Sequence, residues 1–274
     1  MRVLTLTAYA KLNLGLRVMG TRLDAYHEIE STLQTIDLAD RLTLRQTEAL
    51  DVQLEIFPDS GHAPEDDLVH RAASLILARA DHPSGVAIRL EKRIPIGAGL
   101  GGGSSDAAAT LVGLNRLWSL ELPMSDLWEL ALQLGSDVPF FLRGGRCRVG
   151  GRGERIEPVK ASRDETFVLL IPPWSLSTGA VYREYDQRSP SSPLDSPYPN
   201  DLEAAALQLA PQLRIYREWL MSQEVLFGLS GSGAVYYAVT TSLDRANELV
   251  DAARQDLSGT FAVCRPTAHG HRFC

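Results

Sequence analysis

A glycine-rich run over residues 97–106 carries the clearest chemical signal in the chain. It reads Gly97-Ala98-Gly99-Leu100-Gly101-Gly102-Gly103-Ser104-Ser105-Asp106, and apolar residues at helical spacing follow it, so Ser104 or Ser105 is expected to cap a helix. Glycine has no Cβ and lets backbone N–H groups approach a ligand closely, while the start of a helix adds positive potential. The run therefore predicts a polyphosphate-binding loop.

Other interpretations of this run are weaker. A Walker A loop requires a lysine after its second glycine, but Gly102 is followed by Gly103 and Ser104. Residues 97–102 satisfy the bare dinucleotide fingerprint, yet the second strand with an acidic ribose ligand is missing, which disfavours a Rossmann oxidoreductase. A flexible surface turn need not lead into a capped helix, so it is disfavoured too.

Two charged residues outside the run are also candidates for chemistry. Lys11 shares one face of a predicted strand with Asn13, because residues two apart on a strand point the same way. Asp137 precedes Pro139 at the start of a predicted element. Their structural alternatives are a solvated lysine and a helix N-cap.

The elements that hold these residues mix strand and helix. Leu12, Leu14, Leu16 and Val18 alternate with polar residues and predict a half-buried strand over 5–18. Further strands are expected over 29–36, 41–45, 52–57, 86–90 and 167–171, with a hairpin over 146–159, a strand pair around 228–233 and a last strand over 260–265. Helices are expected over 68–80, after Ser104, over 125–134, from a capping box at 200–203, and over 243–257. The pattern is α+β, with a domain boundary between residues 155 and 156.

Composition narrows the class of protein. A net charge of -7 argues against a general nucleic-acid or anionic-membrane binder, so we expect a small-molecule substrate as the partner. The three cysteines show no metal or disulfide spacing, which favours a reducing compartment, the cytoplasm. No apolar run reaches about 18 residues, so neither a membrane span nor a signal peptide is expected. The sequence gives no oligomeric state.

Several motifs together resemble one family. Pro95 and the glycine run are similar to the ATP-binding motif of the GHMP kinases, in the extended form typical of the 4-diphosphocytidyl-2-C-methyl-D-erythritol kinases. Other segments match that family in order and spacing: residues 8–14, 24–28, 134–139, 200–203 and 228–233. Two departures are Ala25, where the family usually has glycine, and Leu229, where methionine is common.

The resemblance implies an activity and a fold. The activity is ATP-dependent phosphorylation of the 2-hydroxyl of 4-diphosphocytidyl-2-C-methyl-D-erythritol, a step of the non-mevalonate isoprenoid route, with Mg²⁺ implied by the chemistry. The fold is the two-domain GHMP kinase fold. Residues 1–155 would form an ATP-binding domain like the second domain of ribosomal protein S5, and 156–274 a ferredoxin-like substrate-binding domain, with a cleft between them.

The resemblance also implies roles for individual residues. Asp137 would be the base and Lys11 would orient the hydroxyl or neutralise charge. ATP would contact Pro95, Gly97, Gly99, Leu100, Gly101, Gly102, Gly103, Ser104 and Ser105. Substrate would contact Asn13, Tyr26, His27, Thr178, Tyr182, Gly231 and Ser232, with the aromatic rings at the cytidine end. Metal ligands are not implied.

Alternatives stay open for some of these residues and for the activity. Tyr182 can be a core residue, and residues 231–233 can be a simple hairpin turn. A solvated hairpin face is favoured for Arg143, Arg146, Arg148, Arg152 and Arg155. A rival activity is that of a GHMP kinase acting on mevalonate, homoserine or a sugar, and a rival class is a catalytically silent binding protein, which the presence of Lys11 and Asp137 disfavours.

Overall fold

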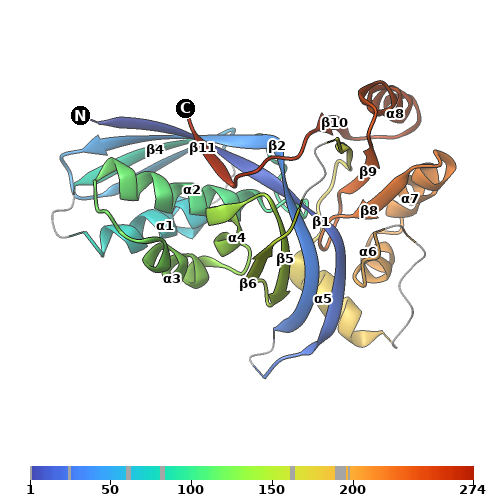
Figure 1. Cartoon of the computed structure of the whole chain (residues 1–274), viewed down its shortest axis with the longest axis horizontal. Helices are drawn as coiled ribbons and strands as arrows, with labels where there is room; N and C mark the ends of the chain where they lie inside the picture. The colour runs from blue at the N-terminus through green and yellow to red at the C-terminus, as the bar shows by residue number, and fades with distance from the viewer. Residues whose placement is uncertain are drawn as a thin grey trace.

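The strand that carries Lys11 organises the fold. In this computed structural model, which describes residues 2–23, 26–59, 63–80, 84–160, 164–188, 196 and 198–274, β1 (Val3–Thr21) pairs antiparallel with β2 (His27–Thr47) along nearly its whole length (Figure 1). Asp24 and Ala25 of the predicted substrate loop lie outside the described residues. Lys11, Leu12 and Asn13 are all buried, so the strand is enclosed on both faces here and is not half-buried as predicted.

The first sheet has seven strands and contains the N-terminal part of the chain. Its main path is β11 (His271–Phe273), β1, β2, β4 (Gly85–Glu91) and β3 (Val52–Phe57), and β2 also pairs with the hairpin of β5 (Arg146–Gly151) and β6 (Arg155–Pro158). Four helices cover one face of this sheet: α1 (Leu68–Leu77), α2 (Gly102–Leu117), α3 (Met124–Leu134) and α4 (Val138–Arg143) (Figure 1). A 3₁₀ turn, Pro64–Asp66, precedes α1.

The second sheet has the ferredoxin-like strand order. Its four antiparallel strands run β10 (Thr260–Cys264), β7 (Thr166–Ile171), β9 (Tyr236–Thr240) and β8 (Leu226–Leu229). In the chain, helices α5 (Thr178–Gln187), α6 (Glu203–Leu209) and α7 (Leu213–Ser222) separate β7 from β8, and α8 (Leu243–Asp256) separates β9 from β10. This is a βαββαβ unit. The predicted α+β fold class with a ferredoxin-like second part is confirmed.

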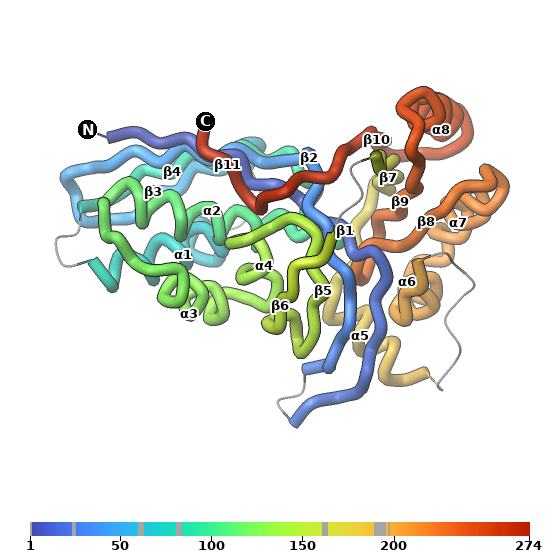
Figure 2. The backbone as a smooth tube through the Cα atoms, in the orientation of Figure 1, coloured from blue at the N-terminus to red at the C-terminus, as the bar shows by residue number. Residues whose placement is uncertain are grey.

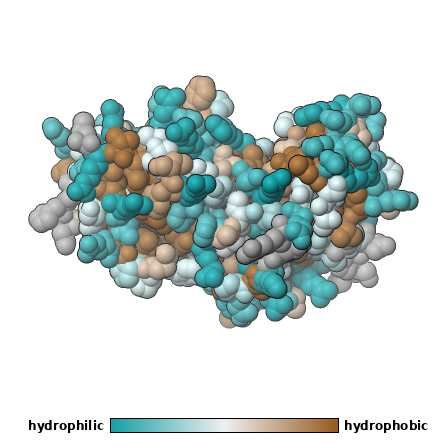
Figure 3. All heavy atoms as spheres, turned by 45° about the horizontal axis from the view of Figure 1, so that its top comes forward, coloured by the Kyte–Doolittle hydropathy of each residue, from teal (hydrophilic) through white to brown (hydrophobic). Residues whose placement is uncertain are grey.

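The two sheets are joined through a shared core. β7 is buried on both faces: Val168 and Leu170 pack among the helices of the second sheet, whereas Phe167, Leu169 and Ile171 pack against β1, β2 and the glycine loop. The opposite face of the first sheet's β1 and β2 has its own core against α1–α4. On the face seen in Figure 3, hydrophilic residues are spread over both halves, with apolar patches between them.

Most of the predicted helices and strands are present in the structure, but several of their details differ from the prediction. Helix α2 starts at Gly102 after a left-handed Gly101 with φ of 70°, so neither Ser104 nor Ser105 is its N-cap. The predicted capping box at 200–203 is wrong, because the buried Glu203 carboxylate accepts a hydrogen bond from Tyr236 (2.7 Å). The strands predicted at 29–36 and 41–45 are one strand, β2. Helix α5 and strand β11 were not predicted.

The domain division is less simple than a single cut in the chain. The predicted boundary between residues 155 and 156 falls inside β6. The last strand, β11, returns to the first sheet and pairs with β1 (Figure 2). The second sheet is therefore inserted between strands of the first.

Two glycines give a matched test of backbone packing. Gly144 has φ of 73° and a Cβ there would lie 1.8 Å from the Gly270 nitrogen, whereas a Cβ on the helical Gly103 would meet only Leu68 Cδ1 at 3.7 Å. Gly144→Ala should lower the free energy of unfolding by at least about 2 kcal/mol, because strain and overlap add. Gly103→Ala should be neutral or stabilise by up to about 1 kcal/mol. Urea unfolding of the two variants checks this, and equal stabilities would contradict the close approach of Gly144 and Gly270.

Candidate active site

A cavity of about 800 Å³ lies where the first sheet, the glycine loop and helix α5 meet. It is lined by almost all of the predicted site residues: Lys11, Asn13, Tyr26, His27, Pro95, Gly97, Gly99, Leu100, Gly101, Gly102, Gly103, Ser104, Asp137, Thr178, Tyr182, Gly231 and Ser232. Ser105 is the exception. It is fully buried and its hydroxyl donates to the Tyr9 carbonyl (2.7 Å), so its side chain fastens α2 to β1 and does not line the cavity.

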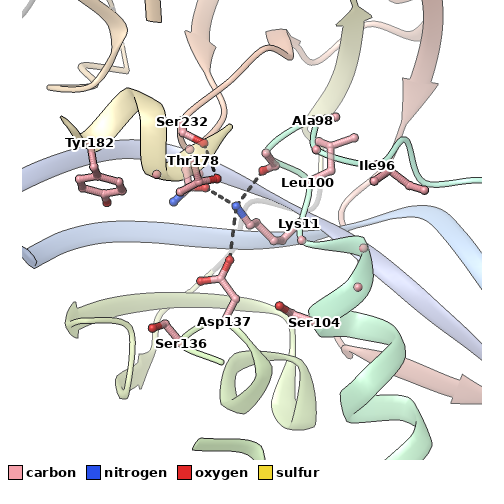
Figure 4. A pocket seen from close by; sticks show the side chains of 18 of the residues that line it. Lys11, Ile96, Ala98, Leu100, Ser104, Ser136, Asp137, Thr178, Tyr182 and Ser232 are labelled. Carbon is pink, nitrogen blue, oxygen red and sulfur yellow. Dashed lines mark hydrogen bonds and ion pairs between the residues drawn. The ribbon is translucent and has the colours of Figure 1, made fainter. Parts of the chain in front are cut away.

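The Lys11 ammonium is buried at the centre of this cavity (Figure 4). Its Nζ donates to Asn13 Oδ1 (2.6 Å) and to the Gly99 carbonyl (2.8 Å), and lies 3.8 Å from Asp137 Oδ2. Burial lowers the pKa of Lys11 below its usual value, and the Asp137 carboxylate offsets part of that shift. The solvated-lysine alternative is therefore wrong, and this ammonium releases its proton more easily than an exposed one.

Asp137 stands at the N-cap position of α4 but does not cap it. Its side chain makes no capping hydrogen bond and is 38% exposed, with Oδ2 facing the Lys11 ammonium (Figure 4). Pro139 supplies no N–H at the first turn of the helix. The carboxylate is thus left available to a group inside the cavity.

The glycine loop places the N-terminus of helix α2 at the same cavity. The first helical hydrogen bond of α2 runs from Ser105 N to Gly101 O (2.9 Å), so the N–H groups of residues 102–104 precede it. Lys11 N donates to Leu100 O (2.9 Å), which holds the loop against β1. Gly99 has φ of 76°, and a Cβ there would lie 2.3 Å from Ser230 O, so only glycine permits this contact.

A hydrogen-bond network fixes Asn13 beside Lys11. Asn13 Nδ2 donates to Ser31 Oγ (2.9 Å), and Ser31 Oγ donates to Gly15 O (2.6 Å). Asn13 N donates to Ser230 Oγ (3.2 Å), and Ser230 Oγ donates to Gly99 O (3.0 Å). The network gives the Asn13 side chain one orientation, with its oxygen toward Lys11.

The third glycine motif is a hairpin connection that also reaches the cavity. Residues 230–235 join β8 to β9, and Ser232 Oγ lies 2.9 Å from Thr178 Oγ1 at the start of α5 (Figure 4). The hairpin interpretation and the site interpretation are therefore compatible.

Aromatic side chains form the far end of the cavity. The rings of His27 and Tyr182 stack with centroids 4.6 Å apart, and His27 Nε2 lies 2.7 Å from Asp186 Oδ1. Burial raises the pKa of Tyr182 well above its usual range, with smaller contributions from the Asp137 and Tyr185 side chains. Tyr182 lines the cavity as well as contacting the second core, so neither of its two interpretations excludes the other.

The hairpin arginines are not one solvated face. The Arg152 guanidinium lies over the Tyr26 ring, 5.0 Å from its centroid, and lines the cavity. Arg146 is nearly buried and pairs with Glu165, while Arg155 pairs with Glu28. The sequence offered no signal for these pairings, since the partners are far apart in the chain.

A buried ionic cluster under the glycine loop was also missed. Lys92 Nζ contacts Asp40 Oδ2 (2.5 Å) and Asp106 Oδ2 (2.7 Å), and both carboxylates are buried. Burial of Lys92 favours a lower pKa, but the two carboxylates together raise it above its usual value. Burial raises the pKa of Asp106 well above its usual range. A lysine at the end of an apolar strand, three residues before Pro95, is the signal that sequence analysis passed over.

Among the described residues, no group of three or more His, Cys, Asp or Glu side chains is placed to hold a metal ion. Nor does any helix of this part of the chain have the length and apolar character that crossing a membrane requires.

Comparison with known proteins agrees with this geometry. The family model of the GHMP kinases N-terminal domain matches residues 67–145. A 4-diphosphocytidyl-2-C-methyl-D-erythritol kinase of Pelotomaculum thermopropionicum is 37% identical over 271 residues, covering 92% of this chain and 94% of the relative. A crystal structure of 4-(cytidine 5′-diphospho)-2C-methyl-D-erythritol kinase has a TM-score of 0.78 and 34% identity, covering 95% of this chain and 99% of that one.

A homoserine kinase from Cytophaga hutchinsonii has a TM-score of 0.81 at 17% identity, over 100% of this chain and 98% of its own, which shows a common fold alone. The high identity to the cytidine-diphospho kinases extends over nearly the full length of both chains. Because of that extent, this chain belongs to the family of the 4-diphosphocytidyl-2-C-methyl-D-erythritol kinases, within the GHMP kinases.

Proposed function

We propose that this protein transfers the γ-phosphoryl group of ATP to the 2-hydroxyl of 4-diphosphocytidyl-2-C-methyl-D-erythritol. The observation that carries the proposal is the pair of Lys11 and Asp137, 3.8 Å apart, between a glycine loop at a helix start and a pocket of stacked rings. The identity of the substrate in this proposal is taken from the names of the similar kinases. A screen of ATP consumption with this substrate, mevalonate, homoserine and galactose tests it, and turnover with another acceptor alone would overturn it.

In our proposal, Asp137 accepts the proton of the attacking hydroxyl. Its carboxylate has no capping duty and is partly exposed to the cavity, so it can reach an acceptor there. An alcohol is a weak nucleophile at neutral pH, and a positioned base lowers the barrier to its attack. Lys11 would steady the same oxygen and the charge that develops on the phosphoryl group.

The glycine loop is our candidate for the triphosphate site. The N–H groups of residues 102–104 and the positive end of α2 suit phosphate oxygens. We also propose that ATP is used with Mg²⁺, and Ser104 and Asp137 are two of the oxygen donors lining the cavity that fit a hard cation. When bound, Mg²⁺ would neutralise charge on the phosphates. Phosphate and water oxygens would complete its coordination.

The aromatic end is our candidate for the cytidine site. Tyr26 and Tyr182 can face a base, and His27 offers a hydrogen bond to its polar edge. The Asp186 carboxylate, 2.7 Å from His27 Nε2, orients the imidazole for that task. Thr178, Gly231 and Ser232 lie between this end and Lys11, where the substrate diphosphate would pass.

We also propose a role for each of the two domains and a location for the protein. The N-terminal sheet would be the ATP-binding domain and the ferredoxin-like part the substrate-binding domain. A cytoplasmic location is supported by Cys147, Cys264 and Cys274 being free thiols.

The pKa values of the two buried lysines should be shifted in opposite directions from the usual value for lysine. Lys11 should lose its proton below the usual pH for lysine and Lys92 above it, because only Lys92 has close carboxylate partners. Asp137→Asn removes the charge that raises the pKa of Lys11, so that pKa should fall further while that of Lys92 stays unchanged. Turnover should accordingly decline as pH rises through the Lys11 pKa. NMR signals of ¹³Cε-labelled lysines followed against pH check the order, and the reverse order would contradict it.

Asp137→Asn should reduce kcat about 10²–10⁴-fold while both ligands still bind. Lys11→Ala should also reduce kcat, and the double variant should lose less than the product of the single losses, because both groups act on one hydroxyl. Steady-state kinetics with parallel binding measurements check this. The control is Asp251→Asn on the exposed face of α8, and the kcat of this variant should equal that of wild type. An Asp137→Asn enzyme within about threefold of wild type would place the base elsewhere.

His27→Ala should weaken use of the cytidine substrate while leaving the KM for ATP near normal. The loss of a hydrogen bond and a stacked ring predicts a fall of about tenfold or more in kcat/KM. Wild type should also use free 2-C-methyl-D-erythritol 4-phosphate poorly. Kinetics with each substrate at saturating ATP measure both effects. Equal use of the two acceptors by wild type would remove the cytidine site from this end of the cavity.

A further inference from the structure

A second cavity, of about 950 Å³, opens on another part of the molecule. It lies between the turn that joins α4 to β5, the end of β6 and the segment that joins β10 to β11. Its lining residues are Arg143, Gly144, Gly145, Arg146, Pro158, Val159, Lys160, Pro266, Thr267, Ala268 and His269. None of these lines the first cavity. Helix α4 separates the two, with Asp137 at its start and Arg143 at its end.

The charge of this second cavity is opposite to that of the chain. Arg143, Arg146 and Lys160 line it, together with His269, and none of its described lining residues is a carboxylate, although the chain carries a net charge of -7. Arg146 is paired with Glu165. Arg143 and Lys160 are exposed, and among the described side chains no carboxylate lies within 4.0 Å of either cation. Two cations without a carboxylate partner in a hollow concentrate positive potential there.

The walls of the second cavity are fixed in place. Thr35 holds two of them: its Oγ1 accepts from Gly145 N (2.9 Å), and its carbonyl accepts from Thr267 N (2.8 Å). The third wall is attached by Val159 N, which donates to Arg146 O (3.0 Å). Gly144, at φ of 73°, lets the 266–269 segment approach the turn. The hollow is therefore formed before any ligand arrives, as binding sites usually are.

Apolar groups lie beside the cations. Pro158, Val159, Pro266 and Ala268 supply surface that bare phosphate does not use. An anion with an organic part would satisfy both kinds of wall, because burial of apolar area adds to the attraction of charge.

We propose that this second cavity binds a small phosphorylated molecule, with the phosphate at Arg143 and Lys160 and the organic part against the two prolines and Val159. The site is independent of the proposed kinase reaction and does not require it. The phosphate of such a ligand carries close to two negative charges at neutral pH, which two cations match.

Calorimetric titration of phenyl phosphate into the full chain tests the proposal. Lys11→Ala changes the first cavity and leaves the second untouched, so it should bind phenyl phosphate as wild type does. The salt concentration is kept low because screening weakens exposed charges. Wild type should bind one phenyl phosphate under these conditions, more tightly than inorganic phosphate, and should not bind phenol. Arg143→Gln and Lys160→Gln should each raise the Kd at least fivefold. Arg148→Gln, an exposed charge on β5 outside the cavity, is the matched control and should leave the Kd unchanged.

Three outcomes would overturn the proposal. If a folded Lys11→Ala variant no longer binds phenyl phosphate, the ligand occupies the first cavity. If Arg148→Gln weakens binding as much as Lys160→Gln, the effect is one of overall charge. If inorganic phosphate binds as tightly as phenyl phosphate, the apolar wall takes no part. Thermal unfolding of each variant accompanies the titrations. Lys160→Glu, at an exposed position two residues after the end of β6, repeats the test without touching Arg143.

Discussion

The carbonyl oxygen of Gly99 accepts two hydrogen bonds, one from Lys11 Nζ at 2.8 Å and one from Ser230 Oγ at 3.0 Å. Through this one atom the first strand, the glycine loop and the connection between β8 and β9 converge. The arrangement requires a residue without Cβ at position 99. It also gives Lys11 a neutral partner that compensates part of the cost of burying its charge. Site geometry and domain contact therefore depend on the same backbone oxygen.

The two buried lysines have different surroundings, which suit Lys92 to a structural role and Lys11 to contact with a ligand. Lys92 is held between Asp40 and Asp106, and its charge is fully compensated, so it stays protonated and fastens the end of β4 to α2. Lys11 has neutral acceptors close by and Asp137 only at 3.8 Å. Its one carboxylate partner is more distant than those of Lys92 and only partly offsets the cost of burial, which leaves the ammonium available to a bound anion. An active site commonly carries this kind of cost.

The sequence was sufficient to predict those features of the fold that depend on neighbouring residues in the chain. The alternation around Lys11 and the helix after the glycine loop follow from side-chain periodicity, and the fold class follows from the order of such elements. The start of α2 was placed too late, because several consecutive glycines can each adopt the left-handed conformation that precedes a helix. The stacking of His27 on Tyr182 and the position of Arg152 over Tyr26 could not be predicted, since these pairs meet only when β2, α5 and the β5–β6 hairpin are folded together.

Strand β1 belongs to both halves of the molecule. Leu6 and Ala8 pack in the core of the first sheet, whereas Leu16 packs in the core of the second, and Tyr237 OH donates to the Asn13 carbonyl (2.9 Å). A rotation of one half against the other would have to bend this strand and break its contacts on one side. Ligand entry and release are therefore expected to proceed through small movements of loops at the rim of the cavity, without the hinge closure that many two-domain enzymes use. Affinity then depends on a site that is already shaped, and little binding energy is lost to rearrangement.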